Sequence, residues 1–195
     1  MDRSNHYEAA FEAYLQWHKL CYVGIDETRR AFLGDRPVKS LDFIVLTDSG
    51  ARLLIDVKGR RFGGTKEKPR KVWECWSTLE DVDGLGRWID LFGSDYVGLL
   101  VFMHQVQSFA DFFDGTGEVW TWRGQRYILR AVEINDYRRH MRTRSPRWGT
   151  VHLPGAVFRE LARPFHVYTV AGRDDFEFPD GPDASPCPAS SSAFV

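Results

Sequence analysis

The chain has 195 residues, enough for one well-packed domain and too few for two ordinary ones. Apolar residues make up 43% of it, which excludes a fully disordered chain. The formal net charge of −1 hides an asymmetry: residues 174–195 contain five acids and no Lys or Arg, leaving about +4 on residues 1–173. Such a small excess permits a nucleic-acid partner without demanding one.

The sequence favours neither a membrane protein nor a protein stabilised by disulfide bonds. No apolar stretch approaches the roughly 20 residues that span a bilayer, and the acidic, amphipathic N-terminus lacks the signal-peptide pattern. We therefore expect no membrane association and a cytoplasmic location. Cys21, Cys75 and Cys187 are widely spaced and form no CxxC pair, so neither a disulfide framework nor a zinc site is predicted. Cys21, in an apolar run, is expected to be a small buried hydrophobe.

The first half of the chain predicts a helix followed by three strands. Residues 5 to about 19 have helical periodicity, with Ser4 or Asn5 as the cap. Residues 20–25 are consistent with a buried strand, and residues 26–38 with a polar loop. Residues 40–46 and 51–59 are β-rich runs separated by the turn sequence TDSG, and together they predict a hairpin. A basic, Gly-rich loop is expected over residues 60–71.

The second half continues with alternating elements. A helix is expected from near Thr78, its N-cap, to Gly93, and the very apolar residues 96–103 predict a central strand. Residues 118–134 predict another hairpin, and a short helix is expected to start at Pro154. The Pro/Ser/Asp-rich residues 174–195 are expected to be a disordered tail. The prediction is one mixed α/β domain over residues 1–173, with a core of about residues 6–103 and an accessory hairpin and helix within about 104–173.

Charged residues interrupt both β runs of the first hairpin. Strand alternation points Leu54, Asp56 and Lys58 to one face, and strand pairing brings Asp42 near Asp56. Two close carboxylates raise each other's proton affinity unless a cation lies between them. Mg²⁺ or Mn²⁺, which prefer oxygen ligands, would relieve this cost. Taken alone, Asp56 and Lys58 also fit an ion pair on an exposed edge strand.

The segment LDFIVLTDSGARLLIDVKG resembles the active-site hairpin of the PD-(D/E)xK phosphodiesterase superfamily, which includes Holliday-junction resolvases and many restriction enzymes. Asp42 matches the first acid of the motif, and Asp56 and Lys58 match its (D/E)xK triplet; Leu41 stands where the motif's name has Pro. The predicted element order also matches the superfamily's restriction-endonuclease-like αβββαβ core, over about residues 6–103. The opening HYEAAFE further resembles the bacterial HYExAFE family.

The resemblance implies a metal site and roles for its residues. Many members of the superfamily place a Glu on the first helix, facing the metal. Glu8 and Glu12 share one helix face, and the spacing favours Glu8, with Glu12 as the second choice. Asp42, Asp56 and Glu8 would hold one or two Mg²⁺, and the Val57 carbonyl would complete the shell. Lys58 would orient the attacking water or offset charge on the phosphate.

Two basic stretches are candidates for binding phosphates, although solvated loops explain such runs equally well. The first follows the triplet and consists of Arg60, Arg61, Lys66, Lys68, Arg70 and Lys71. The second contains Arg138, Arg139, Arg142, Arg144 and Arg147 and ends in Trp148. Trp73, Trp76, Trp120, Trp122 and Trp148 are candidates for stacking on unpaired bases, with core packing as the alternative for those in strands.

These features together predict a Mg²⁺-dependent endonuclease acting on DNA. A structured or branched duplex is favoured over a specific sequence, because no sequence-reading module is recognised. The alternatives are a non-catalytic nucleic-acid-binding protein that retains the fold, and a related nuclease acting on RNA. The acid–acid–Lys set disfavours the first alternative, since clustered carboxylates repel phosphate. Resolvase-like relatives often work as symmetric dimers, so a homodimer is also considered.

Overall fold

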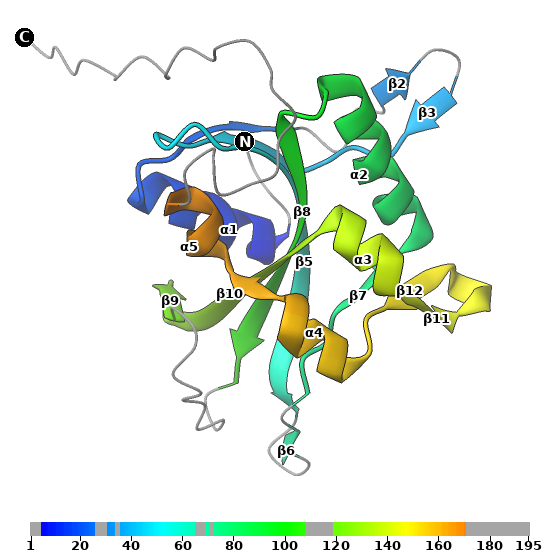
Figure 1. Cartoon of the computed structure of the whole chain (residues 1–195). Coiled ribbons are helices and arrows are strands. Elements are labelled where there is room, and N and C mark those ends of the chain that lie inside the picture. The colour runs from blue at the N-terminus through cyan, green and yellow to red at the C-terminus, as the bar shows by residue number, and fades with distance from the viewer. Residues whose placement is uncertain are drawn as a thin grey trace, which may run out of the picture.

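A mixed β-sheet runs through the centre of the molecule, with helices on both of its faces (Figure 1). The computed structural model describes residues 5–25, 31–33, 36–64, 69–70, 72–107 and 119–170, without the side chains of residues 31–37 and 64–71. The strand order is β1-β4-β5-β8-β10-β13, and β5 and β8 are parallel while the other neighbours are antiparallel. These strands are β1 (Cys21–Gly24), β4 (Phe43–Leu46), β5 (Arg52–Gly64), β8 (Tyr96–Val106), β10 (Gln125–Glu133) and β13 (Arg163–Pro164). In addition, β6 (Pro69–Arg70) pairs with β5, and β9 (Val119–Trp122) with β10.

Strand alternation divides the core between the two faces of this sheet. Leu53, Ile55 and Val57 of β5 pack with α1 (His6–Trp17) and α5 (Phe165–Val170). Leu54 faces the other way, toward α2 (Leu79–Phe92), α3 (Ile134–His140) and α4 (Gly155–Leu161). Both sides of the central strands are therefore buried, which explains their nearly continuous apolar sequence.

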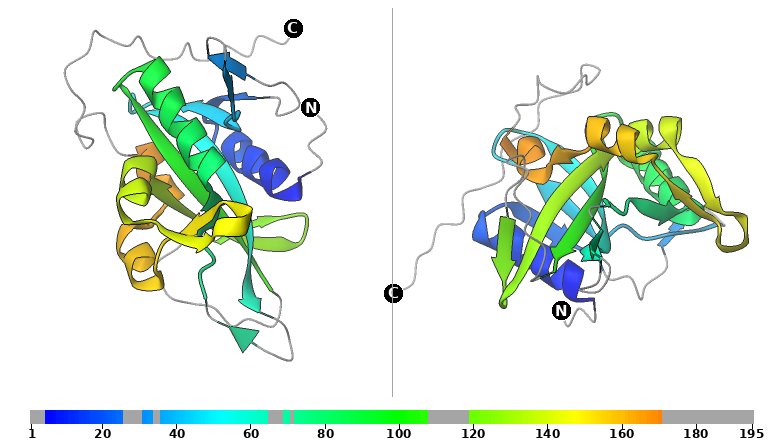
Figure 2. Two further views of the ribbon diagram at one scale, coloured as in Figure 1. Left: turned by 90° about the vertical axis from the view of Figure 1, so that its right-hand side faces the viewer. Right: turned by 90° about the horizontal axis from the view of Figure 1, so that it is seen from below.

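Two smaller sheets complete the described structure. One joins β11 (Arg142–Ser145), β12 (Thr150–His152) and β7 (Trp76–Thr78), and a 3₁₀ turn, η1 (Pro146–Trp148), links β11 to β12. The β11–β12 hairpin projects from the body on the side of α2 and α3 (Figures 1 and 2). The other small sheet pairs β2 (Ala31–Leu33) with β3 (Arg36–Val38). None of the described helices is long and apolar enough to cross a membrane.

The predicted fold class is confirmed. The fold is mixed α/β, and its core elements, α1, β1, β4, β5, α2 and β8, follow in the expected order. Asn5 caps α1 by accepting a hydrogen bond from the Tyr7 amide at 3.1 Å. Thr78 caps α2, as its position before the apolar periodicity predicts.

Several predicted segments are wrong in detail. The strand expected to be buried, β1, is an edge strand on which Val23 is 57% exposed and Cys21 is only partly buried, because β4 is its one partner among the described strands. The expected loop over residues 26–38 contains β2 and β3. The expected loop over residues 60–71 is also wrong, since β5 continues to Gly64 with β8 alongside it to Phe62.

The later part of the chain also differs from the prediction. The hairpin expected to be accessory belongs to the central sheet, because β10 pairs with β8 along its length. The basic stretch after it forms α3, β11 and η1, and α5 follows the predicted helix α4. The predicted tail, residues 174–195, lies outside the described residues.

Candidate active site

The candidate site lies at the edge of β5, just before the first residue of β4, Phe43. The last β4–β5 pair is Phe43 with Ile55, and the Asp42 amide still donates to the Ile55 carbonyl at 2.9 Å. Over Asp56 to Phe62, none of the described strands pairs with this edge, while β8 continues along the opposite edge. Asp42 turns into the opening, and its Oδ2 accepts a hydrogen bond from the Val57 amide at 2.6 Å. A carboxylate therefore satisfies a strand amide that β4 no longer reaches.

Asp56 joins Asp42 at this opening. The residues Asp56 and Asp42 are 4% and 1% exposed, and the Asp42 carboxyl group is close enough to influence the pKa of Asp56. Burial raises the pKa of Asp56 above its ordinary value, although the Lys58 ammonium opposes the shift. The predicted proximity of the two acids is thus present in the structure.

Lys58 connects the acid pair to α2. Its Nζ lies 2.8 Å from Asp56 Oδ1 and 3.0 Å from Asp81 Oδ2. Burial alone would lower the pKa of Lys58, but the two carboxylates outweigh it and raise the pKa above its ordinary value. Lys58 is consequently cationic at neutral pH, a state that does not serve as a general base.

Asp81 was not among the predicted site residues. It stands at the third position of α2 and closes a capping box with Thr78, whose amide donates to Asp81 Oδ2 at 3.1 Å. Ser77 Oγ donates to the same oxygen at 3.1 Å. Burial disfavours the charged carboxylate, yet Lys58 and Thr78 outweigh burial and lower the pKa of Asp81. The Thr-x-x-Asp spacing was the available signal, but it predicts a cap and not a contact with β5.

The N-terminus of α1 forms the opposite wall. Glu8 is 7% exposed and accepts a hydrogen bond from Asn5 Nδ2 at 2.6 Å. Glu12 lies farther along the helix, where its Oε1 accepts from the Tyr22 hydroxyl on β1 at 3.2 Å. Of the two acids, Glu8 is the one that lines the pocket beside Asp56 and Lys58.

A glycine on β5 allows α1 to approach this closely. A Cβ added to Gly59 would lie 2.1 Å from Tyr7 Cδ2, so a larger residue would collide with the Tyr7 ring. Tyr7 also hydrogen-bonds Arg61. Gly59 therefore fixes the start of α1, and with it Glu8, against the strand that carries Asp56 and Lys58.

Together these walls enclose a cavity of about 500 Å³. Asp56, Lys58 and Gly59 line it from β5, while Trp76, Thr78 and Asp81 line it from β7 and the start of α2. Glu8 and Tyr7 contribute from α1. Acids and cations thus converge on one opening from three separate segments, an arrangement typical of a functional site.

Arg60 is partly a structural residue of this cavity. It is 8% exposed, and its guanidinium donates to the Gly59 carbonyl at 2.6 Å and to the Trp76 carbonyl. The same group lies 3.7 Å from the centre of the Trp76 ring. Burial lowers the pKa of Arg60 to about 10, so the residue is still cationic at neutral pH.

The remaining predicted residues are distributed more widely. Arg61 is exposed beside Tyr7, and Arg142, Arg144 and Arg147 are exposed on the β11–β12 hairpin. Lys66, Lys68 and Lys71 lie outside the described residues, as does the side chain of Arg70. The predicted aromatic residues Trp73, Trp76, Trp120 and Trp122 are half-buried, and Trp148 is 70% exposed.

The oxygen donors of the site suit a hard divalent cation. Asp42 and Asp56 offer carboxylate oxygens, the ligands that Mg²⁺ and Mn²⁺ prefer, and the influence of Asp42 on the pKa of Asp56 indicates that the two groups lie close together. Within the described ranges, no cluster of three or more His, Cys, Asp or Glu side chains is positioned as a metal site. The fit therefore rests on the Asp42–Asp56 pair, with Glu8 on the wall of the pocket that Asp56 also lines.

Comparisons with known proteins give a likeness in structure but none in sequence. No protein-family model and no curated protein matches the sequence. Among solved structures, the chain is similar to Hjc, a Holliday junction resolvase from the archaeal hyperthermophile Archaeoglobus fulgidus. The TM-score is 0.46 and the sequence identity 13%, with 84% of this chain and 98% of that chain covered.

Proposed function

We propose that this chain is a Mg²⁺-dependent phosphodiesterase, an endonuclease that acts on DNA. The observation that carries the proposal is the meeting of Asp42, Asp56 and Lys58 at the open edge of β5. Buried charges are costly, and apolar residues of similar size often stabilise such positions equally well or better. The presence of these charged residues beside an open cavity therefore supports a catalytic role over a purely structural one.

The proposed roles follow from charge and position. Asp42 and Asp56 would hold the cation, with Glu8 and the Val57 carbonyl completing its shell. When bound, Mg²⁺ would lower the pKa of a water molecule and offset charge on the attacked phosphate. Lys58, kept cationic by Asp56 and Asp81, would stabilise the added negative charge of the phosphate instead of accepting a proton. Asp81 would hold the ammonium in place.

Basic residues around the cavity support a nucleic-acid substrate. Arg144 lies 5.0 Å from the centre of the Trp76 ring, which lines the cavity, and Arg61 is exposed at the α1 side. Arg142 and Arg147 extend the positive charge along the β11–β12 hairpin. In this proposal they bind phosphates without reading sequence, as the first basic stretch from Arg60 to Lys71 also would.

Cleavage assays on labelled intact duplex, single-stranded and four-way-junction DNA, with Mn²⁺ or with EDTA, test the proposal. We expect metal-dependent cleavage that falls about 100-fold or more in Asp56→Asn and Lys58→Met. Asp48→Asn, exposed in the β4–β5 turn, is the matched control and should cleave like the wild type. Cleavage that persists in both site variants would contradict the proposed mechanism, and no cleavage of any substrate by the wild type would contradict the proposed activity.

A further inference from the structure

The β11–β12 hairpin carries an exposed aromatic residue at its tip. Trp148 ends η1 and is 70% exposed, a large apolar surface for a residue that packs against no core. The Arg147 guanidinium lies 5.3 Å from the centre of its ring. Gly149 follows in the left-handed conformation, with φ of 54°, and turns the chain back into β12. The tip is thus a defined turn that presents an indole beside a cation.

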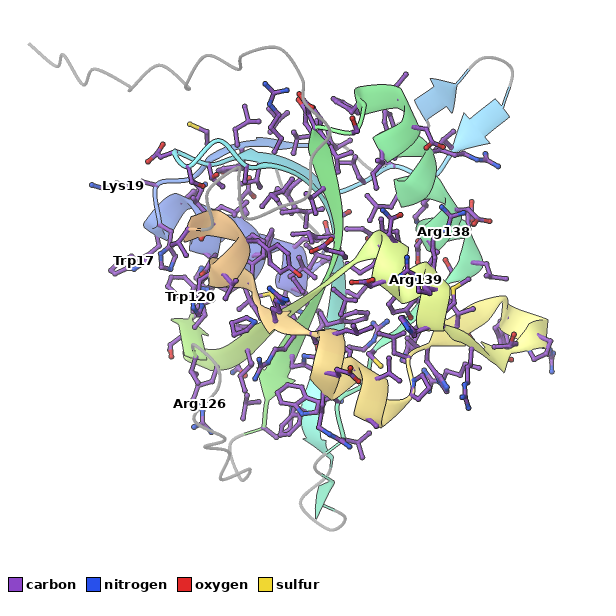
Figure 3. All side chains as sticks on the ribbon, in the orientation of Figure 1. Trp17, Lys19, Trp120, Arg126, Arg138 and Arg139 are labelled. Atoms are coloured by element: carbon purple, nitrogen blue, oxygen red, sulfur yellow. The ribbon has the colours of Figure 1, made fainter. Side chains whose placement is uncertain are left out.

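The charged residues within the hairpin's own sequence have one sign of charge. Residues 137–159 contain six Arg and no Asp or Glu. Arg138 and Arg139 lie on α3 beside the base of the hairpin (Figure 3). Arg142 and Arg144 lie on β11 with one residue between them. A surface of this kind complements a phosphate backbone, whereas a basic or neutral partner would gain less from it.

The tip is also joined to the candidate active site. The Leu79 amide at the start of α2 donates to the Gly149 carbonyl at 2.8 Å, and Thr150 pairs with Thr78, which lines the cavity. Trp148 is two residues from Thr150, so its Cα lies at most about 13 Å from that of Thr78, from Cα spacings of about 3.8 Å and a cross-strand distance of about 5.5 Å. At about 3.4 Å per nucleotide, that is within roughly four nucleotides of the cavity.

We propose that Trp148 is a stacking site for an unpaired base of a DNA substrate, with Arg147 and Arg144 holding the adjoining phosphates. The inference rests on the proposed nuclease function and names its substrate class: duplex DNA interrupted by a flap, gap or junction close to the attacked phosphate. Aromatic rings bind bases of any sequence through their faces, and Arg reinforces the stack by a cation–π interaction. An intact duplex offers no unpaired base to such a site.

Binding measurements in EDTA separate this inference from catalysis. The probes are one intact duplex and the same duplex with a short single-stranded flap that contains 2-aminopurine at its base. Stacking of one base corresponds to a roughly 5- to 150-fold gain in affinity. We expect the wild type to prefer the flapped duplex by a factor in that range and to quench the 2-aminopurine fluorescence. Trp148→Ala should lose both effects.

Trp17→Ala is the matched control. Trp17 is 73% exposed, and it lies with Trp120 on the opposite side of the molecule from the hairpin (Figure 3). This variant should keep the flap preference and the quenching. An unchanged preference in Trp148→Ala, or no preference in the wild type, would overturn the stacking site even if intact duplex is cleaved. A Trp148-dependent preference without any cleavage would support the stacking site and contradict the nuclease activity.

Discussion

The contact between Lys58 and Asp81 makes a quantitative prediction for Asp81→Asn. The ammonium and the carboxylate are 3.0 Å apart, with side chains 14% and 8% exposed. Removing one partner of a buried ion pair costs about 3–5 kcal/mol. Asn retains an acceptor for the Thr78 amide, and Lys58 retains Asp56 at 2.8 Å. We therefore expect the free energy of unfolding at neutral pH to fall by about 3 kcal/mol, the lower end of that range.

The effect should depend on pH. The pKa of Asp81 is lowered in the folded state, so its stabilisation is present above the unfolded pKa of about 3.9 and is lost as the pH falls through the lower folded value. Urea denaturation of wild type and Asp81→Asn at about pH 7 should show the full difference, and the difference should shrink below about pH 3. Asp83→Asn, exposed on the same helix, is the control and should change stability by less than about 0.5 kcal/mol. If Asp81→Asn is as stable as this control, the Lys58–Asp81 contact does not stabilise the folded state as predicted.

Two further predictions concern buried positions near the site. Burial lowers the pKa of His104 to about 3, whereas the unfolded chain takes up the proton below about 6.5. Stability should therefore fall by about 1.4 kcal/mol per pH unit from about pH 6 toward pH 3, and urea titrations of His104→Gln should lack this component; an identical slope in the variant would contradict the assignment. Gly59→Ala should cost about 1–3 kcal/mol through its collision with Tyr7. Thermal melts of the Tyr7→Ala/Gly59→Ala double variant should recover part of that loss relative to the sum of the single variants, and strict additivity would argue against the collision.

The sequence was most informative where local pattern and tertiary environment agree. Asp56 and Lys58 share a strand face because side chains alternate along β5. The short turn before Ala51 pairs β5 with β4, and this pairing places Asp56 near Asp42. Caps at Asn5 and Thr78 are likewise local hydrogen bonds that one residue type predicts. Features of this kind do not depend on where the rest of the chain lies.

Asp81 and Arg60 show where local pattern stops being enough. The Lys58–Asp81 contact requires α2 to start beside β5, and that position depends on the crossover between the parallel strands β5 and β8. Arg60 follows the triplet in a polar run that is typical of a loop. It lies in β5 because β8 continues alongside, and the carbonyl of Trp76 on β7 accepts from its guanidinium. No local spacing predicts either partner.

The position of Glu8 at the pocket, which Glu12 does not line, could be predicted only in part. Both acids occupy one face of α1, so helical periodicity alone left them as alternatives. Gly59 has no side chain, so the Tyr7 ring can pack directly against β5. The first turn of α1, which carries Glu8, therefore lies at the pocket. Glu12 is one turn farther on and meets Tyr22 of β1 instead.

Cleavage by Asp42→Asn tests the central claim most directly. Asn keeps the size of Asp42 and an acceptor for the Val57 amide, so the β4–β5 junction should be preserved while the negative charge is removed. With Mn²⁺ and branched DNA, the claim that Asp42 and Asp56 form a metal-dependent phosphodiesterase site predicts a loss of about 100-fold or more in rate, with the thermal unfolding midpoint close to that of the wild type. A folded Asp42→Asn variant that cleaves as fast as the wild type would contradict the claim.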